Sequence, residues 1–304
     1  MKPFGRLVML IAMLAASVIL LSVLTQVLIK TIYGFGVMDL YPLTDNVDDP
    51  AKLSALKLSQ IISQTALFII PPLLYVKLVE EKNIAEHFLL RKVQQPSTWF
   101  WAFISVFTII PLIGLLVQWN MNMDLPESLS SVEAWMKQSE EAANLVIESF
   151  LQTSTLSGLL VNLLMIAAIP AIGEELLFRG VLQQLLHRMI GKPHLPVIIT
   201  ALLFSAFHMQ FYGFLPRFML GVVLGYAFYI TGSLWVPILI HFVNNGFSVI
   251  AAYLFYNDTI GQNYDEIGMT SQITPIILSV VLTAYVYFRM WRNEKSQSII
   301  SQDY

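Results

Sequence analysis

Eight long runs of apolar residues divide this chain of 304 residues, and they constrain its fold more than any other feature. The runs lie at 7–29, 58–76, 99–119, 159–186, 195–211, 214–230, 234–255 and 273–291. An α-helix needs about 20 apolar residues to cross the hydrocarbon core of a bilayer. With 56% hydrophobic and 12% charged residues, the composition lies outside the range of soluble globular proteins. The sequence therefore predicts an all-α, polytopic membrane helix bundle of about eight transmembrane helices, with residues 1–304 forming a single integral membrane domain.

Three further features narrow the class of protein. The chain contains no cysteine, which excludes disulfides, thiolate nucleophiles and thiolate metal sites. Its formal net charge of -3 is small, so we expect no nucleic-acid partner. The first run follows Lys2 and Arg6 and lacks a small-residue cleavage site, which favours a retained membrane span over a cleaved signal peptide.

The charged residues between the runs separate by sign. One set of loops and termini is basic and carries Lys2, Arg6, Lys77, Lys82, Arg91, Lys92, Arg188, Lys192, Arg289, Arg292 and Lys295. The opposite loops are acidic and carry Asp39, Asp45, Asp48, Asp49, Asp124, Glu127, Glu133, Glu140, Glu141, Glu148, Asp258, Asp265 and Glu266. Basic loops are typical of the cytoplasmic side of a membrane. We therefore expect both termini to be cytoplasmic, in the inner (plasma) membrane of a bacterium.

Residues 130–152, between the third and fourth runs, are predicted to form an amphipathic interfacial helix. The segment Ser130-Ser131-Val132-Glu133 resembles a capping box, and apolar residues follow it at helical spacing. Such a helix would lie on the outer membrane surface or pack over the bundle. A solvated connector is the alternative that the sequence leaves open.

Among the polar or ionisable residues inside apolar runs, six share three neighbouring segments: Glu174, Glu175, Arg179, His208, His241 and Asn245. Such groups are costly to hold in a bilayer, and they mark functional sites by default. The spacing of Glu175 and Arg179 lets them pair on one helix face, whereas Glu174 lies about 100° round the helix without that partner. We therefore predict Glu174 to be a catalytic base and the other two to be a supporting pair. An ion network that only fixes helix packing is the alternative.

The same residues are expected to share one depth in the membrane. Glu174 and His208 lie about equally far on either side of the turn at 191–192, and antiparallel helices would bring them to one level. His241 and Asn245 reach a similar depth from the next turn. A carboxylate and an imidazole can activate water, and two donors one helical turn apart can stabilise an oxyanion. This set of groups suits amide hydrolysis.

Three short motifs contain these residues: Glu174-Glu175-x-x-x-Arg179, Phe204-x-x-x-His208 and His241-x-x-x-Asn245. In them the chain resembles the CAAX prenyl endopeptidase type II and bacteriocin-processing (CPBP, or ABI) family of glutamic intramembrane proteases. The resemblance covers residues 156–255, which we expect to form the catalytic core.

The resemblance implies a glutamate-dependent intramembrane endopeptidase. Glu174 and His208 would activate the water molecule, and His241 and Asn245 would form the oxyanion hole. The substrate would be a membrane-associated or lipidated peptide or protein, in contact with membrane lipid. Supporting roles would fall to Glu175, Arg179 and Phe204, which lies one helical turn before His208. Nothing in the sequence selects the substrate or the cleavage position.

Zinc is an alternative cofactor, because His208, His241 and Glu174 form a set of two imidazoles and one carboxylate. The chain has no His-Glu-x-x-His helix, and Asn245 beside His241 fits hydrogen-bond donation better than ligation. We therefore expect no cofactor and no metal.

Two other functions remain open: a proton-coupled membrane transporter and a catalytically silent membrane scaffold. No internal repeat of the kind common in transporters is evident. The motif Gly221-x-x-x-Gly225 permits close packing of helices. We assign it to packing within the chain, with a homodimer contact as the alternative, and the oligomeric state is not predicted.

Overall fold

The computed structural model describes residues 2–40, 49–270, 272–296 and 298–299, and contains helices but no strand in these ranges. Seven helices are long and apolar enough to cross a membrane: α1 (Pro3–Tyr33), a broken helix over Pro50–Glu80, α5 (Ser97–Met121), a broken helix over Leu156–Ile190, Phe211–Thr231 containing α11 (Phe214–Thr231), α12 (Trp235–Tyr256) and α13 (Ile273–Glu294). The prediction of an all-α polytopic membrane bundle is confirmed.

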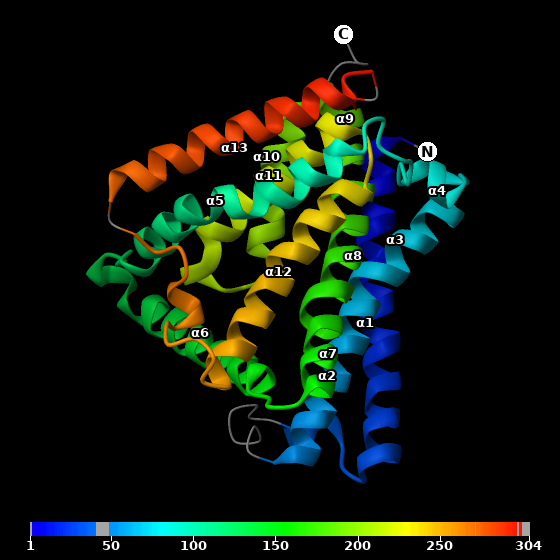
Figure 1. The fold of residues 1–304 in the computed structure, drawn as a ribbon. Coiled ribbons are helices and arrows are strands. Elements are labelled where there is room, and N and C mark those ends of the chain that lie inside the picture. Colours follow the sequence, from blue (N-terminus) through cyan, green and yellow to red (C-terminus); the bar gives the residue numbers. More distant parts are fainter. Residues whose placement is uncertain (1, 41–48, 271, 297, 300–304) are drawn as a thin grey trace.

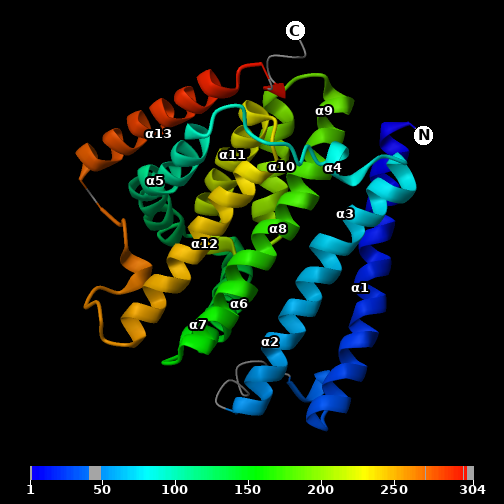
Figure 2. The ribbon, with the colours of Figure 1, turned by 45° about the vertical axis from the view of Figure 1, so that its right-hand side comes forward.

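The helices form one bundle in which α12 has a central place (Figure 1). It packs against α5, α11 and the broken helix over Leu156–Ile190. The helices α5 and α13 lie side by side at one edge of the bundle, and α1 lies at the other (Figures 1 and 2). In both views α1 begins, and α13 ends, at the same end of the bundle.

The helix over Leu156–Ile190 is broken by π-helical turns on either side of the two glutamates. It consists of α7 (Leu156–Asn162), a π-helical segment (Leu163–Ala168), α8 (Ile169–Glu175), a second π-helical segment (Leu176–Gln183) and α9 (Gln184–Ile190). Pro170 contributes to the first break, because proline has no N–H and clashes with the carbonyl four residues earlier. π-Helical turns often occur at functional sites.

The helix over Pro50–Glu80 is built in the same way. It consists of α2 (Pro50–Gln64), a π-helical segment (Thr65–Ile69), α3 (Ile70–Tyr75) and a π-helical segment (Val76–Glu80). Pro71 and Pro72 lie in the first turn of α3. The first π-helical segment packs directly against α8, since a Cβ atom added to Gly173 would lie 2.8 Å from the Cβ atom of Phe68. This close contact holds the two broken helices together at the level of the glutamates.

The fifth predicted run, 195–211, forms a shorter helix than expected, α10 (His194–Ala206). Its 13 residues span only about 20 Å, less than the thickness of a bilayer core. The prediction that His208 lies on a membrane-spanning helix is therefore wrong: His208 lies in the turn that follows. Its ring Nδ1 lies 2.8 Å from the carbonyl oxygen of Phe204, and Met209 then adopts a left-handed φ of 53°, so the chain leaves the helix.

The two glycines of Gly221-x-x-x-Gly225 lie inside the chain. A Cβ atom on Gly221 would lie 3.0 Å from Ala201 of α10, and one on Gly225 would lie 2.8 Å from Val197. The carbonyl of Gly225 accepts a hydrogen bond from Gln183 Nε2 at 3.1 Å. The assignment of this motif to packing within the chain is confirmed.

The segment after α5 forms α6 (Ser130–Leu151), without the predicted capping box. A 3-10 turn over Glu127–Leu129 runs directly into α6, so its first serine is already helical and makes no capping hydrogen bond. Glu133 instead accepts from the backbone N–H of Leu125 at 3.2 Å and from Lys137 Nζ at 2.6 Å. Its two oxygens are thus occupied elsewhere, and the capping-box prediction is wrong.

The remaining elements are short: 3-10 turns over Val37–Leu40, Phe211–Gly213 and Tyr264–Glu266, and α4 (Ile84–His87). Asp45 and Asp48, two of the acidic loop residues, lie outside the described residues. The orientation of the bundle in a membrane stays a prediction.

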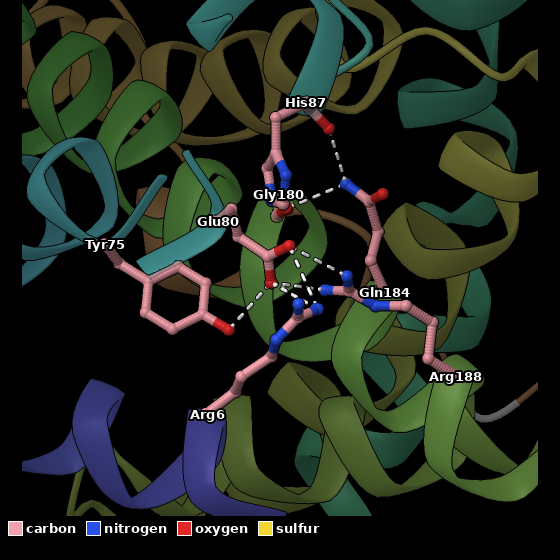
Figure 3. A network of polar contacts seen from close by, with 7 residues as sticks. All are labelled: Arg6, Tyr75, Glu80, His87, Gly180, Gln184 and Arg188. Carbon is pink, nitrogen blue, oxygen red and sulfur yellow. Dashed lines mark hydrogen bonds and ion pairs between the residues drawn. The ribbon is translucent and has the colours of Figure 1, made fainter. Parts of the chain in front are cut away.

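A buried carboxylate joins three helices at the end of the bundle where the chain begins (Figure 3). The side chain of Glu80 is 1% exposed and lies 3.1 Å from Arg6 Nη1 of α1 and 2.9 Å from Arg188 Nη2 of α9. The hydroxyl of Tyr75 also donates a hydrogen bond to Glu80 at 3.0 Å. One carboxylate therefore compensates two guanidinium groups. It links α1, the broken helix over Pro50–Glu80 and α9.

The histidine of α4 lies beside this cluster, outside the membrane-spanning helices. Its backbone carbonyl accepts a hydrogen bond from Gln184 Nε2 at 3.0 Å, which ties α4 to α9 (Figure 3). The side chain of His87 is buried, and this burial lowers its pKa to about 4. The ring is thus neutral at physiological pH.

Candidate functional site

A cavity of ≈ 830 Å³ lies between α6, α8, the π-helical break near Phe68 and the α10–α11 turn. Glu174, His208 and Asn245 all line it, so residues from the three separate motifs meet at one place. Its volume is within the range of small-molecule and peptide-binding sites. Much of the remaining wall is apolar, with the aromatic rings of Phe178 and Phe207 next to the polar groups.

The two adjacent glutamates have different surroundings. Glu175 is fully buried, and its Oε1 lies 2.7 Å from Arg179 Nη1 and 3.0 Å from His241 Nδ1. Glu174 points into the cavity, and in the described structure its carboxylate makes no hydrogen bond. Its Oε2 lies 3.9 Å from His241 Nε2. The imidazole of His241 thus lies between a hydrogen-bonded carboxylate, Glu175, and one that makes no hydrogen bond, Glu174.

Arg179 is fully buried, and three contacts stabilise its positive charge, while its Nε has no hydrogen-bond partner among the described residues. Nη1 donates to Glu175, Nη2 donates to the carbonyl of Gly221 at 3.0 Å, and the guanidinium carbon lies 4.7 Å from the ring centroid of Phe204. A buried charge is tolerated when it is paired and hydrogen-bonded in this way. This arrangement fixes the side of α8 from which Glu174 projects.

Phe204 lies between the two histidines of the site. Its ring centroid is 5.2 Å from that of His208 and 5.9 Å from that of His241, both in edge-on geometry. Phe204 is almost fully buried, so it limits how far either imidazole can rotate. Phe204 therefore restricts the orientation of both imidazole rings, and it also contacts the guanidinium of Arg179.

The hydrogen bond of His208 decides which nitrogen faces the cavity. A carbonyl oxygen only accepts, so Nδ1 carries the proton in the contact with the Phe204 carbonyl. In the neutral ring Nε2 is then an acceptor. The described residues show no hydrogen bond between His208 and Glu174, and a water molecule between them is compatible with both groups.

Asn245 is held by the break that Pro170 makes in its helix. Proline has no N–H to donate to the carbonyl of Ile166, four residues earlier, and Asn245 Nδ2 donates to that carbonyl at 3.1 Å. Its Oδ1 accepts from Asn244 Nδ2 at 3.1 Å. Since an amide nitrogen has two hydrogens, one donor remains for the cavity.

The structure adds polar residues that the sequence analysis did not single out, among them Gln210 and Arg217. Gln210 and Arg217 line the same cavity as Glu174. Arg217 is a lone cation inside the apolar run 214–230, which is the signal that could have identified it. The geometry also differs from the expected pairing, because the imidazole that approaches Glu174 at 3.9 Å belongs to His241.

Within the described ranges no three His, Cys, Asp or Glu side chains are grouped closely enough to hold a metal ion. The described structure thus does not group His208, His241 and Glu174, which suggested a zinc site, as a set of metal ligands. The expectation of a metal-free site stays a prediction.

Part of the chain matches a model of a known protein family. Residues 156–247 match the family model described as type II CAAX prenyl endopeptidase Rce1-like. The matched segment runs from α7 into α12 and includes all three motifs. No curated protein and no solved structure matches the chain.

Proposed function

We propose, from the match of residues 156–247 to the type II CAAX prenyl endopeptidase Rce1-like family model, that this integral membrane protein hydrolyses a peptide bond with water activated by Glu174. The family match supports an intramembrane protease of the CAAX type. Our more specific proposal is that Glu174 is its catalytic base. The observation that carries it is the contrast between Glu175, which is hydrogen-bonded to Arg179, and Glu174, which makes no hydrogen bond and faces the cavity.

In the proposed reaction a water molecule lies between Glu174 and Nε2 of His208. Glu174 accepts a proton as the water oxygen attacks the scissile carbonyl, and it returns that proton to the leaving amine. His208 orients the water through its free ring nitrogen. The negative charge that forms on the carbonyl oxygen is stabilised by hydrogen-bond donors fixed in advance.

Asn245 and His241 are the proposed donors to this oxyanion. The amide of Asn245 has one hydrogen left over from its bond to Ile166. The ring of His241 already directs Nδ1 at Glu175, so a second donor at Nε2 requires the doubly protonated ring. The mechanism thus demands an imidazolium at His241 when the intermediate forms.

The proposed substrate is a membrane-associated or lipidated peptide or protein, whose apolar part contacts the aromatic wall of the cavity. The placement in a bacterial inner membrane with both termini cytoplasmic also remains part of the proposal. A proton-coupled transporter could use the same carboxylate and imidazole as a proton relay, but neither a transporter nor a silent scaffold would cleave a peptide bond.

The test is a comparison of membrane fractions from cells that contain the wild type, Glu174→Gln or Glu141→Gln. Glu141 is an exposed residue of α6 and serves as a matched control for the same change. We expect one or more precursor peptides to accumulate only with Glu174→Gln. Identical peptide patterns in all three samples would refute the proposed protease.

The metal-free mechanism has a separate test. The purified protein is exhaustively chelated, its metal content is measured, and cleavage of the accumulated precursor is assayed. We expect unchanged activity. Activity that is lost with the metal and restored by added zinc would overturn this part of the proposal.

A further inference from the structure

Arg217 is a charged residue in the cavity for which the proposed chemistry has no use. It lies in the first turn of α11, and it lines the same cavity as Glu174, His208 and Asn245. It is also the only lysine or arginine among the described residues that line this cavity. The proposed reaction assigns roles to Glu174, His208, His241 and Asn245 and none to Arg217, so this cation needs a separate explanation.

The charge of Arg217 is not neutralised by contact. In the described part of the chain no carboxylate lies within 4.0 Å of its guanidinium, in contrast to Arg179, which is paired at 2.7 Å. Glu140 of α6 and Glu174 act on Arg217 only through longer-range electrostatics. A partly buried guanidinium without a paired anion is well suited to bind an anionic ligand.

The guanidinium is nevertheless held in place. Nη1 donates to the backbone carbonyl of Gln210 at 3.3 Å, and Nη2 donates to its Oε1 at 2.5 Å. The guanidinium also occupies the space that a side chain at Gly213 would fill. Since a guanidinium has five N–H donors, the two contacts with Gln210 leave donors for a ligand.

We propose that Arg217 binds a carboxylate of the substrate and thereby sets which peptide bond reaches Glu174. A carboxylate matches the planar fork of a guanidinium and carries one charge, which a single cation can balance. A phosphate group carries more charge, and the described wall of the cavity has no second lysine or arginine to balance it. This inference rests on the proposed protease function, since it concerns the substrate of the same cavity.

The carboxylate has two possible sources: the free C-terminus of the substrate and an acidic side chain near the scissile bond. Three fluorophore-labelled peptides distinguish them. Each contains a prenylated cysteine followed by two aliphatic residues and a last residue. The first ends in serine with a free carboxylate, the second in serine amide and the third in glutamate amide.

Binding is measured with Glu174→Gln protein, so that it does not depend on cleavage. We expect one of the two carboxylate peptides to bind about 10–100-fold more tightly than the serine amide, as a charged hydrogen bond implies. Adding Arg217→Gln should reduce this ratio to about one. Adding Arg292→Gln, at an exposed arginine of α13, should leave the ratio unchanged. A change in the ratio between matched peptides is not produced by a general weakening of the fold.

Equal binding of all three peptides, no binding of any, or a ratio that Arg217→Gln leaves intact would overturn the inference. If Arg217→Gln does not fold, Arg217→Lys decides: a reduced ratio supports the inference, since the ammonium keeps the charge and loses the fork, and an unchanged ratio overturns it. Cleavage of the same peptides by the wild-type protein tests the proposed function separately. Arg217-dependent binding without any cleavage would refute the protease and leave the carboxylate site standing.

Discussion

Adjacent glutamates with opposite surroundings should respond in opposite ways to the same substitution. Glu175→Gln removes the charge that compensates Arg179, which is fully buried, and weakens the contact to His241 at 3.0 Å. Glu174→Gln removes a carboxylate that makes no hydrogen bond in the described structure. We therefore predict a large loss of stability for Glu175→Gln and none for Glu174→Gln.

The size of the stability loss in Glu175→Gln depends on how well the charge of Arg179 is still compensated. Removing one partner of a buried ion pair costs about 3–5 kcal/mol, because the other charge is left uncompensated. The lower end of this range applies here, since the carbonyl of Gly221 and the charge of Glu174 still act on the guanidinium. A loss of about 3 kcal/mol corresponds to a fall in Tm of about 6–12 °C.

The assay is thermal unfolding of the purified variants in one detergent, followed by circular dichroism at the helical band. Glu174→Gln should unfold within about 2 °C of the wild type, on the scale of a surface substitution. Glu141→Gln controls for the chemical change at an exposed site. A Tm of Glu175→Gln close to the wild type, or an equal fall for both variants, would refute the division of roles between the two glutamates.

Three further predictions concern other parts of the molecule. Glu80→Gln should lower stability by about 2–3 kcal/mol in denaturant unfolding, because it leaves two partly exposed arginines without their anion; the pair of Glu133 with the exposed Lys137 serves as control, and Lys137→Gln should be indistinguishable from the wild type. Stability should fall as the pH drops from 6.5 to 4, because His87 binds a proton in the unfolded chain in this range and, with its pKa of about 4, does not bind one in the folded chain. The dependence of Tm on pH should therefore be weaker in His87→Gln than in the wild type, and an unchanged slope would contradict this assignment. Asn245→Ala should lower the free energy of unfolding by about 1–3 kcal/mol, since the carbonyl of Ile166 loses its donor, and it should also lower activity. A Tm equal to that of the wild type would show that this hydrogen bond does not contribute to stability.

The membrane bundle could be predicted from the sequence because hydropathy depends on local composition alone. The long apolar runs became helices with nearly the expected bounds, for example α5 at Ser97–Met121 against the predicted 99–119. The end of α10 could not be predicted in this way. It depends on a local contact between the ring of His208 and the carbonyl of Phe204, which hydropathy does not register.

The candidate site was predictable in its members and less so in its geometry. Charged residues in apolar runs identified Glu174 and its neighbours without any contact information. The approach of His241 to both glutamates depends on how α12 packs against α8, and sequence spacing fixes only the contacts within one helix. Arg217 was missed because it lies near the start of its run, where a cation is commonly placed at the membrane interface.

The central claim is that Glu174 activates the attacking water, and single-turnover cleavage by purified protein tests it most directly. The substrate is the precursor that accumulates with Glu174→Gln, and the enzymes are the wild type, Glu174→Gln and Glu141→Gln in the same detergent. We predict that Glu174→Gln cleaves about 10²–10⁴-fold more slowly while its Tm is unchanged, because the amide keeps the shape of the side chain and cannot accept the proton. A rate within threefold of the wild type would contradict the account.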